Sequence, residues 1–145
     1  MEIYTIGFTK KTAEKFFGKL KSSGIERLLD VRLNNTSQLA SFAKTPDLAF
    51  FLNKLCDIDY IHEPKLAPTQ EILDKFKKKK GTWEEYTENF MSLMKSREIE
   101  KEIDPALFDK KTVLLCSEHM PENCHRSLVV DYLSSKWGHI QVHHL

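Results

Sequence analysis

The segment that most constrains the fold of this chain runs from Lys111 to Arg126. It begins with an apolar run, Val113 to Leu115, that is too short for an ordinary helix, and a polar loop follows. Beyond the loop, apolar residues recur at helical spacing at Leu128, Val129, Tyr132 and Leu133. The segment therefore predicts a strand, a loop and a helix in this order.

A unit of this kind places its loop at the carboxyl end of a parallel strand, where ligand sites form in open α/β sheets. The first turn of the helix adds free N–H groups and the positive end of the helix dipole. The loop and this turn carry more reactive side chains than core packing requires: Cys116, Glu118, His119, Cys124, His125 and Arg126. We expect the working site of the protein here.

Elsewhere, predicted strands alternate with predicted helices. Apolar and β-branched runs predict strands near residues 3–6, 27–33, 59–63 and 140–145. Thr12 can cap a first helix, the Thr45-Pro46 pair suits an N-cap with proline at the first helical position, and Thr82 begins a capping box. A further helix is expected from Thr69, and a less regular one over residues 99–103.

This order predicts an α/β fold with a mainly parallel sheet of about five strands and helices on both faces, in three layers. The 145 residues fit a single domain spanning positions 1–145. The long helical stretch between Pro64 and Leu107 exceeds what one crossover needs, so it could cover the site as a lid.

Charge and hydropathy make nucleic acid and membranes less favoured as partners. With 22 basic and 21 acidic residues the net charge is +1, so no overall basic field favours nucleic acid. Lys77 to Lys80, with Trp83 and Tyr86 nearby, could contact nucleic acid, but we favour a solvated helix end. No signal-like start or membrane-spanning run is present, so we expect no membrane partner and a cytoplasmic location.

The chain has three cysteines, an odd number, and its start does not look like an export signal. We therefore expect free thiols rather than a disulfide framework. Cys124 follows Asn123, a good N-cap residue, so its sulfur should lie in a helical first turn that favours the thiolate. It is a candidate nucleophile, although a small buried packing residue is as good an interpretation. A metal centre could use Cys116, Cys124, His125 and His62, but the Cys-x7-Cys-His spacing matches no usual zinc pattern, so we expect no metal. We expect no cofactor either.

Charged residues near the predicted strand ends complete the candidate site. Asp30 and Glu118 are suited to proton transfer, and Arg32 and Arg126 offer forked donors to a small anionic ligand. Cys116 and His125 are assigned with the arginines to substrate binding. Alternatively, Asp30–Arg126 or Glu118–Arg32 ion pairs only fix the loops.

Three functions remain open. The first is an enzyme acting on a small anionic substrate, including nucleotide-like ones. The second is a noncatalytic module that binds an anion or nucleic acid. The third is a redox sensor, which predicts that Cys116 and Cys124 crosslink under mild oxidant.

A family resemblance rests on several segments together: Tyr4-Thr5-Ile6-Gly7, Asp30-Val31-Arg32, Ser37, Phe42, Tyr60, His62, Trp83, Leu115-Cys116-x-Glu118 and Cys124-His125-Arg126. With these the chain resembles the DUF488 family of small α/β proteins, whose biochemical role is not established. The resemblance implies the α/β fold and this site, to which it adds Ser37, but names no reaction. Phe8 stands where that family typically has histidine.

Overall fold

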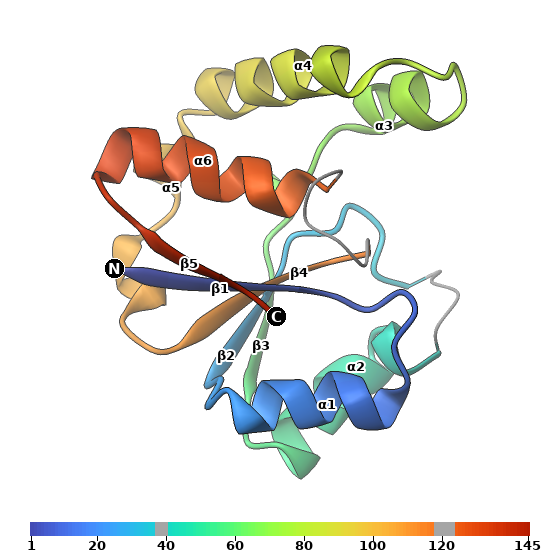
Figure 1. Ribbon diagram of the computed structural model, residues 1–145, viewed down its shortest axis with the longest axis vertical. Coiled ribbons are helices and arrows are strands. Elements are labelled where there is room, and N and C mark those ends of the chain that lie inside the picture. The colour runs from blue at the N-terminus through green and yellow to red at the C-terminus, as the bar shows by residue number, and fades with distance from the viewer. Residues whose placement is uncertain (37–40, 118–123) are drawn as a thin grey trace.

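The computed structural model describes residues 1–36, 41–117 and 124–145 (Figure 1). Its five strands in these ranges form one parallel sheet in the order β3-β2-β4-β1-β5. The strands are β1 (Glu2–Gly7), β2 (Arg27–Asp30), β3 (Asp59–His62), β4 (Thr112–Cys116) and β5 (Gln141–His144). The predicted α/β fold with a mainly parallel sheet is confirmed.

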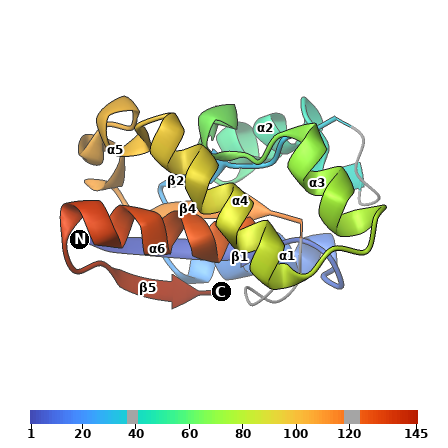
Figure 2. The same ribbon diagram turned by 90° about the horizontal axis from the view of Figure 1, so that it is seen from above.

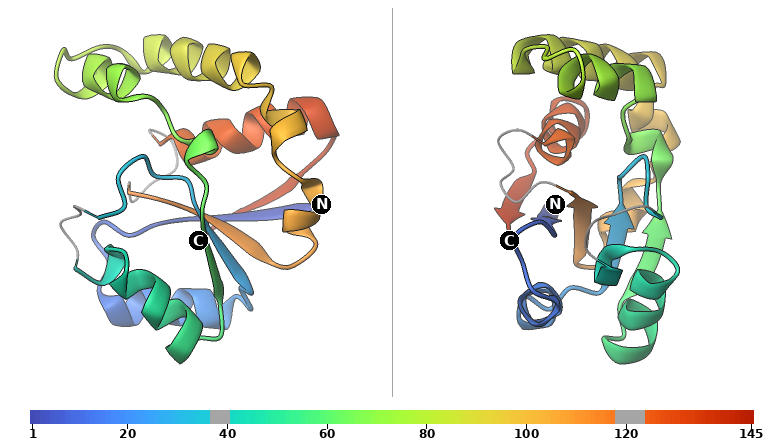
Figure 3. Two further views of the ribbon diagram at one scale, coloured as in Figure 1. Left: turned by 180° about the vertical axis from the view of Figure 1, so that it is seen from behind. Right: turned by 90° about the vertical axis from the view of Figure 1, so that its right-hand side faces the viewer.

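Helices cover both faces of the sheet. On one face lie α1 (Ala13–Ser22) and α2 (Asp47–Phe50), and a π-helical turn over Phe51–Leu55 continues α2 (Figure 1). On the other face lies α6 (His125–Trp137), with α3 (Gln70–Lys77) and α4 (Trp83–Ser96) outside it (Figures 2 and 3). The three expected layers are present, and α3 and α4 add a partial further one.

Short helical segments complete the connections. They are α5 (Ile99–Glu102) and the 3₁₀ turns Ser41–Ala43, Pro64–Leu66 and Pro105–Phe108. In the parts of the chain that the structure describes, no helix is both long enough and apolar enough to cross a membrane.

Threonine caps begin the helices as the sequence indicates. Thr12 accepts a hydrogen bond from the backbone N–H of Lys15 at 3.2 Å, and Thr82 accepts one from Glu85 at 3.1 Å. The N-cap prediction for Thr45 was wrong. Pro46 occupies the cap position, and the Thr45 hydroxyl donates instead to Tyr60 Oη at 3.1 Å, because a tertiary partner competes with the helix end.

Two element boundaries near the site also differ from expectation. Strand β2 ends at Asp30 rather than near position 33, because Asp30 Oδ1 accepts a hydrogen bond from the Arg32 backbone N–H at 3.2 Å and turns the chain. Helix α6 is capped by Cys124, whose φ and ψ of −133° and 139° are extended. The expected cap, Asn123, lies outside the described residues.

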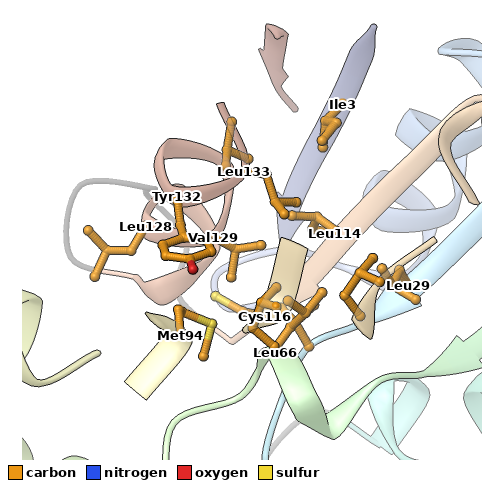
Figure 4. Close-up of a cluster of buried hydrophobic side chains, with 14 of the residues drawn as sticks. Ile3, Leu29, Leu66, Met94, Leu114, Cys116, Leu128, Val129, Tyr132 and Leu133 are labelled. Carbon is orange, nitrogen blue, oxygen red and sulfur yellow. The ribbon is translucent and has the colours of Figure 1, made fainter. Parts of the chain in front are cut away.

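The buried core has two parts, one on each face of the sheet. Along β4, Val113 and Leu115 contact the cluster beneath α1 and α2, whereas Leu114 and Cys116 belong to the cluster beneath α6 (Figure 4). Every residue of β4 is buried, as expected for a central parallel strand. Its carboxyl end therefore leads from a buried core into the candidate site.

Candidate functional site

The predicted site residues come together at the carboxyl edge of the sheet. Asp30 is the last residue of β2 and Cys116 the last of β4, and these strands are neighbours with Asp30 opposite Leu115. Arg126 lies in the first turn of α6, which follows β4 in the chain. The predicted convergence of Asp30 and Arg126 at one edge is confirmed.

Asp30 and Arg32 form a buried ion pair. The Arg32 Nε donates to Asp30 Oδ1 at 2.8 Å and Nη2 donates to Oδ2 at 2.7 Å, and the side chains are 0% and 3% exposed. The pairing of Asp30 with Arg126 considered from the sequence was therefore wrong. Arg32 follows Asp30 by two residues, across the turn after β2, so its side chain can fold back onto the Asp30 carboxylate.

Tyr60, on the adjacent strand β3, completes the environment of this carboxylate. Its hydroxyl donates to Asp30 Oδ2 at 2.5 Å and accepts hydrogen bonds from Asn35 and Thr45 at 3.1 Å each. Burial raises the pKa of Tyr60, and the Asp30 charge raises it further. Both oxygens of Asp30 are thus occupied by donors.

Arg32 is held from three directions and still has one donor group to offer. The Phe8 ring lies 5.5 Å from the guanidinium carbon, and the backbone oxygen of Arg32 lies 2.9 Å from His62 Nε2. Asp30 holds Nε and Nη2, whereas Nη1 is buried and has no hydrogen-bond partner among the described residues. A buried donor of this kind calls for an explanation.

A cavity of about 140 Å³ opens beside these groups. It is lined by Arg32, Leu33, Asn34, Pro68, Leu73, Phe76, Lys77, Tyr86, Cys116, Ser117, Cys124 and His125. Helix α3 and the first turn of α4, which belong to the stretch between Pro64 and Leu107, form one wall of the cavity. The role of this stretch as a lid stays a prediction. Asp30 is not in the lining.

Two cysteines meet at the cavity wall. The Sγ atoms of Cys116 and Cys124 are joined in a disulfide, so the expectation of three free thiols was wrong. The cysteine count could not show that the end of β4 and the cap of α6 lie side by side. Cys56 remains a free thiol beyond the π-helical turn, where burial raises its pKa.

His125 lies between the cysteines and the loop after β2. Its Nε2 is 2.7 Å from the Val31 backbone oxygen, and burial lowers the pKa of His125 to about 4, an effect that Arg126 reinforces. The neutral ring must donate Nε2–H, because a carbonyl oxygen only accepts. Nδ1 therefore carries the lone pair.

Arg126 places a buried positive charge beneath the cysteines. It is 0% exposed, and its Nη1 donates to Cys116 Sγ at 3.5 Å. Lys11, whose Nζ donates to the Gly7 carbonyl at 2.9 Å, has a pKa lowered by burial and by Arg126. Positive charge therefore gathers at this edge of the sheet.

Ser37, Glu118 and His119 lie outside the described residues. Reasoning from individual residues did not identify three contributors: Tyr60 on Asp30, Phe8 on Arg32 and Phe76 in the cavity wall. Phe8 directly follows β1, and Tyr60 lies in the short strand β3. These positions were the sequence signal by which the two residues could have been found. The chemical roles predicted for Asp30, Glu118 and Cys124 remain predictions.

Comparison with known proteins identifies a family. A family model described as "Domain of unknown function DUF488" matches residues 12–133. This range includes β2, β3, β4 and most of α6, and with them Arg32, Cys116, Cys124, His125 and Arg126. No curated protein and no solved structure matches the chain.

Proposed function

We propose a function from the geometry of the site, because this chain belongs to the DUF488 family, whose domain is described as one of unknown function. The protein is an enzyme that binds a small anionic substrate in the cavity at the carboxyl edge of the sheet. The observation that carries this proposal is Arg32 Nη1, a buried donor without a partner among the described residues, on a side chain that lines the cavity.

The surrounding charges favour an anion. Asp30 neutralises most of the charge of Arg32, so the pair alone supplies orientation more than attraction. Further positive charge comes from Arg126 beneath Cys116 and from Lys77 in the cavity wall. An anionic group in the cavity would accept a hydrogen bond from Arg32 Nη1 while it lies near these charges.

The cavity volume limits the size of the ligand. Drug-sized ligands occupy cavities of about 300–1,000 Å³, whereas this cavity has about 140 Å³. It is large enough for a phosphate, sulfonate or carboxylate group with a few attached atoms. A nucleotide would have to extend beyond the part of the site that the structure describes.

The proposed roles follow from the contacts. Asp30 positions Arg32, since donors already occupy both of its oxygens. Cys124, in the dithiol form of the protein, is the nucleophile, because the N-terminus of the 13-residue helix α6 favours its thiolate. Arg126 supports the thiolate of Cys116 in the same way.

A thermal-shift screen tests the anion site. Reduced wild-type protein is heated with phosphate, sulfate, small carboxylates, sugar phosphates and nucleotides. A ligand at about 100 times its Kd stabilises the native state by about 2.7 kcal/mol. We expect one of these classes to raise Tm, and the Arg32→Lys variant, which keeps the charge but loses the forked donors, to lose the shift.

Arg27→Lys provides the matched control. Arg27 lies at the opposite end of β2, where Nη1 donates to the Leu107 carbonyl at 2.8 Å, so its replacement should leave the ligand shift intact. An equal shift in wild type and Arg32→Lys would refute the proposed contact. If no anion raises Tm in the wild type, the anion site does not exist.

A thiol redox switch is a second candidate, favoured by the Cys116–Cys124 disulfide. Oxidation removes two electrons and two protons from the thiols, and hydrogen peroxide with these electrons and protons gives two molecules of water. Cys56 is an internal standard. Intact mass after alkylation should show three labels on reduced protein and only the Cys56 label after mild oxidation; three labels in both states would exclude the switch.

A further inference from the structure

Three metal-binding side chains converge on one wall of the cavity. The two sulfurs of Cys116 and Cys124 and one ring nitrogen of His125 all lie within 4.8 Å of one another. Ligands around a tetrahedral zinc ion are about 3.3–3.8 Å apart, given bonds of about 2.3 Å to sulfur and about 2.0 Å to nitrogen. The spacing in the sequence argued against a zinc site made of these residues, but the end of β4 and the start of α6 bring the three side chains together.

The orientation of His125 is that of a metal ligand. Metal-bound histidines almost always donate their second ring N–H to a carbonyl, a carboxylate or water, which fixes the ring. His125 Nε2 makes this contact with the Val31 oxygen at 2.7 Å. Nδ1, with its lone pair, is the atom left for a cation.

Arg126 repels a cation directly, but it stabilises the thiolate of Cys116 that would bind one. Two thiolates balance a divalent ion, so the metal centre itself is neutral. Arg126 Nη1 donates a hydrogen bond to Cys116 Sγ at 3.5 Å. This contact favours the thiolate form of Cys116 and tunes it as a ligand. The cluster is nearly dry, with Cys116 at 0% and Cys124 at 4% exposure.

We propose that the dithiol form of this protein binds one zinc ion through Cys116 Sγ, Cys124 Sγ and His125 Nδ1. Two thiolates and one imidazole favour zinc over magnesium or calcium, which prefer oxygen ligands. Formation of the disulfide removes both thiolates, so the oxidised protein does not bind the ion.

Cys116, Cys124 and His125 line the same cavity as Arg32, so an ion held by these three ligands would have its fourth position open to this cavity. Three protein ligands with an open position are typical of a catalytic zinc site, whereas structural sites have four protein ligands. An anion held by Arg32 could therefore also reach the metal. This last point rests on the proposed function, but binding of the metal does not.

Cobalt titration of the full chain tests the site. Protein freed of metal with a chelator, reduced and kept under inert gas, is titrated with Co²⁺ and then with Zn²⁺. We expect one Co²⁺ per chain, with thiolate-to-cobalt charge-transfer absorption and the intense visible bands of tetrahedral cobalt. Zn²⁺ should abolish both.

Variants assign the ligands. Cys124→Ser and His125→Asn should each weaken Co²⁺ binding at least tenfold, whereas Cys56→Ser, which removes the cysteine outside the cluster, should bind like wild type. Circular dichroism checks that each variant is folded. Oxidised wild-type protein is a control without any substitution: it should not bind Co²⁺ until a dithiol reductant restores the thiols.

Either of two results would overturn the metal site. One is a Co²⁺ titration of the reduced wild-type protein that gives no thiolate-to-cobalt charge-transfer absorption. The other is Co²⁺ binding by folded Cys124→Ser that is as tight as that of the wild type. Arg32→Lys should still bind one Co²⁺. Cobalt binding by a wild-type protein whose Tm no anion raises, or an anion shift that Arg32→Lys keeps in full, refutes only the proposed function. An anion shift without cobalt binding refutes only the metal site.

Discussion

Asp30 shows how one buried carboxylate can organise the edge of a sheet. Its oxygens accept hydrogen bonds from Arg32 and Tyr60, and its Oδ1 also ends strand β2 by bonding to the Arg32 backbone. A buried ion pair contributes little net stability, but removing one partner leaves the other charge uncompensated. The pair therefore fixes the direction of Arg32 toward the cavity.

Asp30→Asn should lower the free energy of unfolding by about 3–5 kcal/mol, because Arg32 stays buried without a counter-charge. Urea unfolding measures the change. The control is Asp59→Asn, which removes an exposed carboxylate that contacts Lys110 and Arg27 and should cost at most about 1 kcal/mol. Equal losses in the two variants would contradict the assigned role of Asp30.

His125 should make stability depend on pH. Burial lowers its pKa from 6.5 to about 4, so between these values the unfolded chain binds a proton that the folded protein does not. The free energy of unfolding should therefore fall as the pH falls through this range, by about 3 kcal/mol in total. Above pH 6.5 this contribution is fully present.

Urea unfolding across this range, with a chelator present, measures the effect. Other groups titrate in the same range, so the His125→Asn variant supplies the reference. We expect a steeper loss of stability in wild type than in the variant. Parallel pH profiles would show that His125 is protonated equally in the folded and unfolded states.

Among the secondary-structure elements, the turn between α3 and α4 sets the position of one cavity wall. The backbone N–H of Gly81 bonds to the Lys75 carbonyl at 2.9 Å, and Thr82 then caps α4. Trp83 and Tyr86, which follow this turn, pack against Phe76, which precedes it, with tilted rings whose centroids lie 5.7 Å and 5.1 Å from that of Phe76. A displacement of the turn would therefore move Phe76 and Tyr86 together.

Gly81→Ala should destabilise the protein by about 1–3 kcal/mol, because the new Cβ would lie 2.7 Å from the Lys75 carbonyl oxygen. Gly18→Ala is the matched control. No atom lies within 4 Å of its added Cβ, and alanine is the better helix former in α1, so this variant should gain about 0.5–1 kcal/mol. Thermal unfolding of both variants should give Tm shifts of opposite sign.

At the scale of the whole molecule, the parallel sheet separates two cores that share strand β4. Leu114 packs under α6 and Leu115 under α1 and α2, and both are fully buried. Neither core contains all of the site. The disulfide and His125 lie on the α6 side, and His125 Nε2 contacts the Val31 backbone oxygen in the segment that follows β2.

Leu114→Ala and Leu115→Ala should each lower the free energy of unfolding by about 2–5 kcal/mol, since each leaves a cavity in a different core. Leu55→Ala, at a position 65% exposed, should stay within about 0.5 kcal/mol of wild type. A small loss in either β4 variant would mean that one face of the sheet is not packed as described.

The sequence by itself determined the local elements and their order. Short apolar runs such as Val113 to Leu115 and caps such as Thr12 and Thr82 specify strands and helix starts through backbone hydrogen bonding and hydrophobic spacing, which are local properties. The right-handed, short connections of α/β units then brought the carboxyl ends together. This is why Asp30 and Arg126 could be assigned to one edge.

Only the tertiary structure decided which side chains are partners. Thr45 binds Tyr60 rather than capping a helix, Asp30 pairs with Arg32, and Cys116 meets Cys124. Such choices depend on the twist of the sheet and on the exact ends of elements, where a shift of one residue changes the direction of a side chain. They also depend on burial, which makes each polar group bond to whichever partner the packing brings within reach.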